Sequence, residues 1–266
     1  MTTSVKSFMV RDWWLFFVLF GAVVGCNQGV REASQQTLLV SVAASLSDVI
    51  DDVAQAFKRE TGTHVLANIA GSQVLATQII GGVETDVFVS ADLYQMLRVV
   101  DAGRIEGKQI VELLSNQLVI AVPSDRLGSV TNPADLTSAS ITRIAIGDPE
   151  AVPAGVYARQ YLEAVGVWAA VAEKIVPVRS VREAIRAVEF GTVDAGVVYR
   201  TDVATSVKAV VAYKVELDHG PRIVYPAAML SDASNPDNAK MFIDYLQGRE
   251  AQRLFDAAGF VRLLGS

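Results

Sequence analysis

Cysteine and histidine are nearly missing from this chain, which has one cysteine and two histidines among its 266 residues. The lone Cys26 has no partner for an internal disulfide, so no disulfide framework supports the fold. His64 and His219 stand apart from each other and from Cys26, whereas a transition-metal cation needs several such ligands gathered together. The sequence therefore predicts no site for a metal cation.

Positive charge is also scarce. Lys and Arg number 23 against 29 Asp and Glu, which gives a formal net charge of −6. The basic residues form no cluster and do not gather at a glycine-rich turn. A nucleic-acid partner is not expected, because such partners are met by a basic patch. The acidic balance also repels anions on average, so any anion site must be built from local groups.

The chain also offers no nucleophile for covalent catalysis. No serine lies in a nucleophile elbow with a histidine and an aspartate in a recognisable order. An enzyme of that kind needs a nucleophile beside a general base. We therefore predict a protein without catalytic activity and without a cofactor.

The most hydrophobic run, residues 13–25, is too short to span a bilayer comfortably. Two basic residues precede it, so residues 1–25 have the pattern of a secretory signal. The run ends in the letters VVGC, which resemble a bacterial lipobox, with Cys26 as the lipidated first residue. We predict that residues 26–37 form a polar tether and that the rest of the chain folds outside the cytoplasm, beside a membrane.

Residues 38–57, with the sequence LLVSVAASLSDVIDDVAQAF, combine a hydrophobic strand with an amphipathic helix. Ser45 stands at the junction and Asp48 follows three residues later, a pattern that predicts a capping box. A helix start at the end of a strand presents unpaired N–H groups and a partial positive charge, which suit an anion. The same arrangement recurs at Ser72, and residues 180–183 predict a second capping box.

Strands and helices alternate along the whole chain, with short glycine-rich links between them. Strands are predicted at residues 38–44, 64–69, 86–91, 118–122, 144–146, 175–178, 193–199, 207–213 and 223–229. Residues 118–122 are uniformly apolar, which is typical of a parallel strand covered on both faces. The alternation predicts an α/β fold with mostly parallel sheets.

The helical residues 241–258 are predicted to return to the first half of the fold. The chain would then form two lobes, each a sheet with flanking helices, joined by two crossing segments. We predict that residues 38–120 and 226–266 form lobe 1 and that residues 121–225 form lobe 2. Such a clamshell binds its ligand in the cleft, at the carboxyl ends of the strands.

Several motifs resemble one known family. They are AAS at 43–45, AGS at 70–72, DVFVSAD at 86–92, GDP at 147–149 with VPAG at 152–155, and AGVVY at 195–199. Together they are similar to the substrate-binding proteins of bacterial ABC importers, and among these to the molybdate- and tungstate-binding proteins. The resemblance spans residues 38–262. It implies a monomeric receptor in the periplasm or on the outer face of the membrane, which delivers molybdate or tungstate to a membrane permease.

The resemblance also implies that hydroxyls and backbone N–H groups alone hold the oxyanion. Ser45 and Ser72 would offer both kinds of donor, Ala154 and Val181 would offer a backbone N–H, and Tyr199 would offer its phenol. Molybdate carries no proton at neutral pH, so its oxygens only accept hydrogen bonds and no lysine or arginine is required beside it. Hydrogenphosphate would need an acceptor as well.

Three alternatives stay open. Sulfate is also a tetrahedral acceptor, so the protein could be a receptor for sulfate or another oxyanion, and cavity size would have to separate it from molybdate. Asp148, the one carboxylate in these turns, is expected to hold its own turn and not a phosphate proton. A transferase or hydrolase could use the same two-lobed fold. A sensor without a ligand would leave the cleft without free donors.

Overall fold

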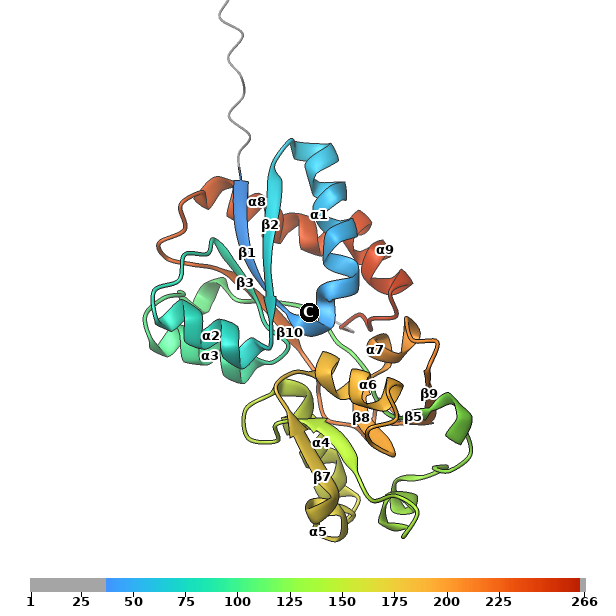
Figure 1. The fold of residues 1–266 in the computed structure, drawn as a ribbon. Helices are drawn as coiled ribbons and strands as arrows, with labels where there is room; N and C mark the ends of the chain where they lie inside the picture. Colours follow the sequence, from blue (N-terminus) through green and yellow to red (C-terminus); the bar gives the residue numbers. More distant parts are fainter. Residues whose placement is uncertain (1–36, 264–266) are drawn as a thin grey trace, which may run out of the picture. The chain divides into compact units, whose positions relative to one another are not determined.

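The structure is a computed structural model that describes residues 37–263, whose strands form two five-stranded sheets (Figure 1). The order is β2-β1-β3-β10-β4 in the first sheet and β7-β6-β8-β5-β9 in the second. The first sheet contains β1 (Thr37–Ala43), β2 (His64–Ala70), β3 (Val87–Val89), β4 (Val111–Leu114) and β10 (Tyr225–Met229). The second contains β5 (Leu118–Pro123), β6 (Ile144–Gly147), β7 (Ile175–Val178), β8 (Ala195–Tyr199) and β9 (Ala209–Lys214).

Helices alternate with these strands and flank both sheets, which confirms the predicted two-lobed α/β fold. They are α1 (Ser47–Thr61), α2 (Ser72–Ile80), α3 (Leu93–Asp101), α4 (Pro153–Ala164), α5 (Trp168–Val171), α6 (Val181–Glu189), α7 (Arg200–Ala204), α8 (Pro236–Gln247) and α9 (Arg249–Ala257). Over residues 37–263, no helix combines the length and hydrophobicity that a membrane span needs. The predicted signal, residues 1–25, and Cys26 lie outside the described residues.

One strand of each sheet runs opposite to the other four. In the first sheet it is β10, which pairs antiparallel with β3 and β4. In the second it is β5, which pairs antiparallel with β8 and β9. The predicted burial of β5 is confirmed, since all its residues are buried, but its predicted parallel pairing is wrong. Both strands follow a passage from the other sheet, and the chain enters each sheet from the end where the two sheets meet.

The two passages between the sheets lie at residues 115–117, after β4, and at residues 215–224, before β10. Strand pairing therefore puts the whole of β5 in the second sheet and the whole of β10 in the first. The division of the chain into lobes at 120/121 and 225/226 stays a prediction. The first passage has only three residues, so β4 and β5 lie close together although they belong to different sheets.

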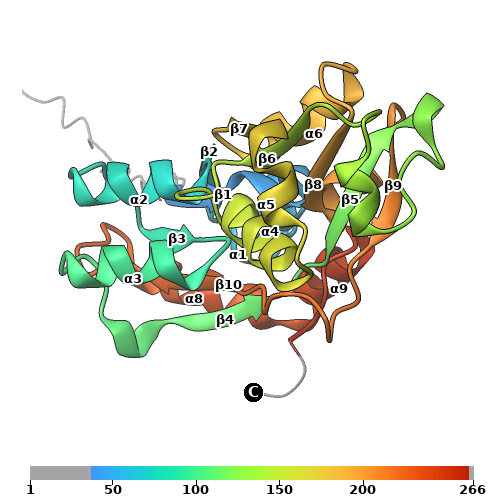
Figure 2. The ribbon, with the colours of Figure 1, turned by 90° about the horizontal axis from the view of Figure 1, so that it is seen from below.

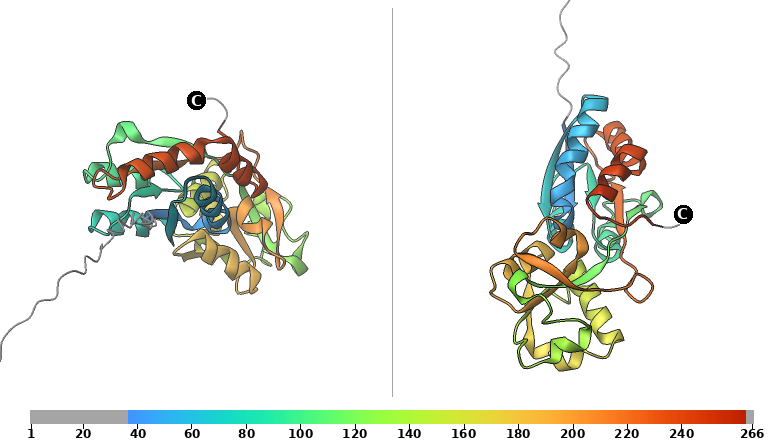
Figure 3. Two further views of the ribbon diagram at one scale, coloured as in Figure 1. Left: turned by 90° about the horizontal axis from the view of Figure 1, so that it is seen from above. Right: turned by 90° about the vertical axis from the view of Figure 1, so that its right-hand side faces the viewer.

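Alternate residues of β3 face two different hydrophobic cores, as the period of two along a strand requires. Val87 and Val89 face the core that includes Phe57 of α1. Phe88 faces a smaller core that includes Met96 of α3. In Figure 2 α2 and α3 lie together, and in Figure 3 the red helices α8 and α9 lie beside the blue α1. These helices thus cover the first sheet on both faces.

The start of α4 packs directly against the end of β6, and a glycine makes this possible. A Cβ atom on Gly155 would lie 2.0 Å from the carbonyl oxygen of Gly147. No side chain fits there, so the helix start and the strand end approach as closely as two backbones can. The position of the N–H groups at the start of α4 therefore depends on this glycine.

We predict that Gly155→Ala lowers the melting temperature, because the first turn of α4 must move away from Gly147. Overpacking of this kind costs about 1–3 kcal/mol, which corresponds to a decrease of roughly 2–12 °C for a chain of this size. Gly107→Ala is the control, since its Cβ would lie 3.5 Å from Val100 Cγ1, an ordinary contact. Equal melting temperatures for the two variants, measured by calorimetry, would contradict the prediction.

Candidate functional site

A small cavity of about 20 Å³ lies where the starts of α2, α4 and α6, the turn before α1 and the end of β8 meet. All five site residues predicted from the sequence line it, namely Ser45, Ser72, Ala154, Val181 and Tyr199. The two serines come from turns of the first sheet and the other three residues from the second. Both sheets contribute to its lining, so the surrounding groups converge closely on one point.

Free backbone N–H groups at the cavity come from four separate turns. Within residues 37–263, the N–H groups of Ser45, Ser72, Ala154 and Val181 donate no hydrogen bond. Ser45 lies in a 3₁₀ turn, and the other three lie in the first two positions of α2, α4 and α6. An N–H in the first turn of a helix has no acceptor within that helix. These groups therefore stay available to an external acceptor.

The role predicted for Ser45 as the N-cap of α1 is wrong. A 3₁₀ turn, Ala44–Leu46, precedes the helix, and Leu46 occupies the N-cap position without a side-chain bond. Because this extra turn moves the helix start to Ser47, the capping box of Ser45 and Asp48 does not form. The Oγ atom of Ser45 instead accepts a hydrogen bond from the hydroxyl of Tyr225, at 2.9 Å.

Ser72 and Ser180 use their hydroxyls differently. Ser72 Oγ accepts a hydrogen bond from the backbone N–H of Ala91, at 2.9 Å, and leaves its own hydrogen unused. Ser180 caps α6, since its Oγ accepts from the N–H of Glu183 at 3.2 Å. The Glu183 carboxylate accepts from the N–H of Arg179 instead of that of Ser180. Only the first half of the second predicted capping box is therefore confirmed.

Tyr199 ends β8 with a hydroxyl that has no hydrogen-bond partner within the described part of the chain. The residue is only 1% exposed. Burial raises the pKa of the Tyr199 hydroxyl well above its ordinary value, so the hydroxyl keeps its hydrogen. A buried polar group without a partner costs about 1–3 kcal/mol. An acceptor placed in the cavity would remove that cost.

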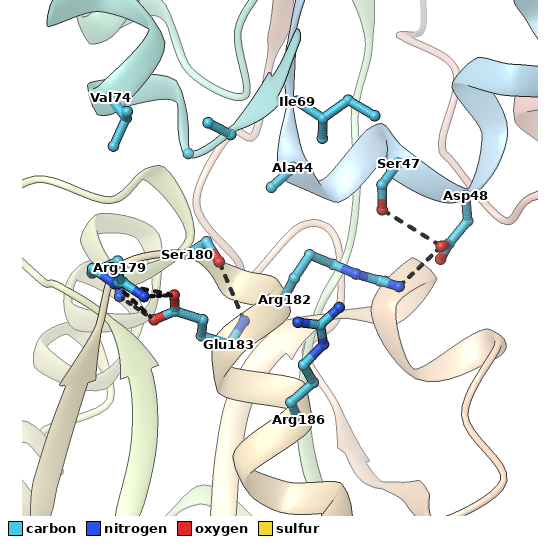
Figure 4. A pocket seen from close by; sticks show the side chains of 12 residues that line it. Ala44, Ser47, Asp48, Ile69, Val74, Arg179, Ser180, Arg182, Glu183 and Arg186 are labelled. Carbon is cyan, nitrogen blue, oxygen red and sulfur yellow. Dashed lines mark hydrogen bonds and ion pairs between the residues drawn. The ribbon is translucent and has the colours of Figure 1, made fainter. Parts of the chain in front are cut away.

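A larger pocket of about 480 Å³ adjoins the cavity and shares Ala44, Gly71 and Ser180 with it. Charged side chains line this pocket, and Figure 4 shows Arg182 reaching across it to Asp48. The Arg182 guanidinium donates to Asp48 at 2.9 Å and to Asp202 at 3.2 Å. A cation thus lies nearer to the site than the sequence predicted. Two carboxylates balance its charge, and it does not line the small cavity.

Asp202 lies beneath Tyr199 and is buried completely. Its carboxylate accepts the backbone N–H of Tyr199 at 3.1 Å as well as the guanidinium of Arg182. Burial raises the pKa of Asp202 to about 7, although Arg182 opposes this shift. Because the pKa is higher in the folded chain than in an unfolded one, protonation of Asp202 stabilises the fold. Its contribution is complete below about pH 4 and is lost as the pH rises to about 7.

We predict that the melting temperature of the wild type rises as the pH falls from 8 to 5 and that Asp202→Asn weakens this dependence. The variant keeps an acceptor for the Tyr199 N–H but does not titrate. Its free energy of unfolding should therefore lack the increase that Asp202 gives the wild type below pH 7, about 1.4 kcal/mol per pH unit. The pKa of Asp92 is also raised, to about 6, and its effect on the pH dependence of stability is the same in the wild type and the variant. Asp51→Asn, at an exposed site, is the control. Parallel pH curves for the wild type and Asp202→Asn would refute this prediction.

Comparisons with known sequences give relatives over almost the whole chain. The Escherichia coli (strain K12) molybdate-binding protein ModA is 34% identical over 259 residues, which cover 95% of this chain and 99% of the relative. YvgL of Bacillus subtilis (strain 168), whose name describes an ABC transporter substrate-binding lipoprotein, is 35% identical over 246 residues, 91% of this chain and 94% of the relative. Both relatives therefore align with the chain along almost its whole length.

The solved structures give the same fold. The periplasmic molybdate-binding protein of Azotobacter vinelandii superposes with a TM-score of 0.77 at 24% identity, over 85% of this chain and 99% of that one. The family model of bacterial extracellular solute-binding proteins matches residues 38–261, which include both sheets and every residue of the cavity. The chain belongs to the family of bacterial extracellular solute-binding proteins.

Proposed function

We propose that this protein binds molybdate in the small cavity between its two sheets and delivers it to the permease of an ABC importer. One observation carries the proposal. The cavity is surrounded by four free backbone N–H groups and by the hydroxyls of Ser45, Ser72 and Tyr199, all of them uncharged donors. Molybdate presents four oxygens that only accept hydrogen bonds. A site made of donors and a ligand made of acceptors satisfy each other.

The donors are sufficient to offset the burial of a dianion. A hydrogen bond to a charged acceptor contributes roughly 1.5–3 kcal/mol, and seven such donors are available. The starts of α2, α4 and α6 add partial positive charge at the same point. Formal cations are not needed, and none lines the cavity among residues 37–263.

Phosphate is disfavoured by the same arrangement. Near neutral pH it keeps a proton, which needs an acceptor. Asp148, in the turn before α4, accepts the N–H of Glu150 at 2.9 Å and so holds its own turn, as predicted. Within the described residues no carboxylate lines the cavity. Sulfate has no proton, so it must be separated from molybdate by its smaller size, and Pro153 in the wall limits how far the cavity can contract.

The names of relatives support the same ligand and the same partner. ModA of Escherichia coli is named as molybdate-binding, and YvgL is named as an ABC transporter substrate-binding protein.

Tungstate has the same tetrahedral shape and charge as molybdate, so we propose that it binds as well. The relatives of this chain are solute-binding proteins, and we propose that the chain performs no catalysis on its ligand. We also propose that it acts as a monomer.

Lipid anchoring at Cys26 is part of this proposal. The support is the signal pattern of residues 1–25, the lipobox-like letters before Cys26 and the word lipoprotein in the name of YvgL. The anchor would hold the folded part in the periplasm or on the outer face of the membrane. There it would lie close to the permease that receives the anion.

Thermal melting of the chain from residue 27 onward tests the ligand. At about 100 times its dissociation constant a ligand stabilises by about 2.7 kcal/mol, which is roughly 5–11 °C for a chain of this size. We expect such a rise with molybdate and with tungstate, and little change with sulfate or phosphate at the same concentration. An equal rise with sulfate would favour a general oxyanion receptor. No rise with any of the four would contradict the proposal.

Removal of a serine hydroxyl tests the site. Ser45→Ala and Ser72→Ala each delete one donor, so molybdate affinity should fall about 10- to 100-fold in calorimetric titration. Ser41→Ala is the control, because Ser41 is a buried serine of β1 whose hydroxyl has no partner within the described residues and does not line the cavity. Wild-type affinity in both cavity variants would remove these serines from the site.

A further inference from the structure

Three buried side chains form a hydrogen-bonded chain that ends at Ser45. The Nδ2 atom of Asn116 lies 3.3 Å from the hydroxyl oxygen of Tyr225, and that oxygen lies 2.9 Å from Ser45 Oγ. Asn116 is 2% exposed and Tyr225 is completely buried. Asn116 belongs to the first passage between the sheets, and Tyr225 begins β10, directly after the second. The first passage and the strand that follows the second thus each contribute a side chain that supports the site.

The direction of these hydrogen bonds follows from Asn116. Its Oδ1 accepts the N–H of Gln117 at 2.8 Å, and its Nδ2 also donates to Thr201 Oγ1 at 2.9 Å. These two bonds set the orientation of the amide, so its NH₂ group faces Tyr225. The Tyr225 oxygen therefore accepts from Asn116, and Ser45 Oγ is the one acceptor within reach of its hydrogen among the described residues. Burial raises the pKa of Tyr225 far above its ordinary value, so that hydrogen is retained.

A serine hydroxyl that accepts such a bond has its own hydrogen free. The Ser45 hydrogen points away from Tyr225, and Ser45 lines the cavity. The hydroxyl hydrogen of Ser72 is free for a different reason. Its Oγ accepts the N–H of Ala91, a group that can only donate. Both cavity serines are thereby held as donors, one by a tyrosine and one by the backbone.

We infer that Tyr225 and Asn116 are positioning residues that determine selectivity: they hold the Ser45 hydroxyl as a donor, so the cavity rejects oxyanions that carry a proton. The inference rests on the proposed function and extends it to residues that do not touch the ligand. The bond from Tyr225 fills one of the two lone pairs of Ser45 Oγ. Without it that lone pair is free, the hydroxyl can rotate, and its oxygen can accept the proton of hydrogenphosphate more readily. Fully deprotonated tetrahedra gain nothing from that rotation.

Tyr225→Phe tests this inference, with dissociation constants measured for molybdate directly and for sulfate and phosphate by competition at pH 8. We expect molybdate and sulfate to weaken by the same factor, about 3- to 10-fold, the value of one neutral hydrogen bond. Phosphate should keep or gain affinity, so the preference for molybdate over phosphate falls while that for molybdate over sulfate is unchanged. If the substitution merely loosened the cavity, the preference for molybdate over sulfate would change, because cavity size separates these two anions.

Two further variants complete the experiment. Tyr245→Phe is the matched control, since it removes a buried tyrosine hydroxyl without a partner in the described chain, far from the cavity. Asn116→Asp replaces a donor by an acceptor of the same size, so the Tyr225 hydrogen turns toward residue 116 and the same fall in the phosphate ratio is expected. This second route keeps the test valid even if Tyr225→Phe folds poorly.

The outcomes separate the inference from the function on which it rests. If the wild-type protein does not bind molybdate, the proposed function fails. If the wild type binds molybdate and both variants keep the wild-type molybdate-to-phosphate ratio, the function stands and the inference is overturned. A change in the molybdate-to-sulfate ratio of the same size as the change for phosphate also overturns it, since Tyr225 would then act only on the shape of the cavity.

Discussion

The candidate site depends on backbone N–H groups that their own helices cannot satisfy. Every helix start leaves such groups, and they are usually met by capping side chains or by water. Here N–H groups from four turns converge on one small cavity. The convergence makes an anion with several acceptor oxygens the natural partner, and it explains how an acidic chain builds an anion site without a cation in the cavity wall.

Formal charges near the cavity serve a different purpose. Arg182 of α6 binds Asp48 of α1 and Asp202 of α7, and Asp48 also accepts the hydroxyl of Thr205. The contacts of Asp48 with Arg182 and Thr205 join α1, beside the first sheet, to the second, so they help to hold the arrangement in which the donors converge. The guanidinium pairs with Asp48 and does not line the cavity. The charged contacts join the two lobes, and the uncharged donors surround the cavity.

The roles of individual side chains depend on how far away their partners lie. Asp148 bonds to an N–H two residues away, and Ser180 bonds to one three residues away, so local patterns predicted both. Ser45 was expected to act in the same local way, but its partner, Tyr225, is 180 residues distant. Nothing near Tyr225 in the sequence signals this contact. The extra 3₁₀ turn that frees Ser45 from capping is equally invisible in the local pattern.

Local patterns in the chain were enough to predict the alternating α/β architecture and most helix ends, and the resemblance to a family predicted five of the residues that line the cavity. They were enough because hydrophobic period and turn residues act over a few neighbouring positions. The reversed direction of β5, the place of the first passage between the sheets, the partner of Ser45 and the position of Arg182 required the folded chain. Each of these depends on which distant segments pack side by side, and that is a property of the whole core and not of any short stretch of sequence.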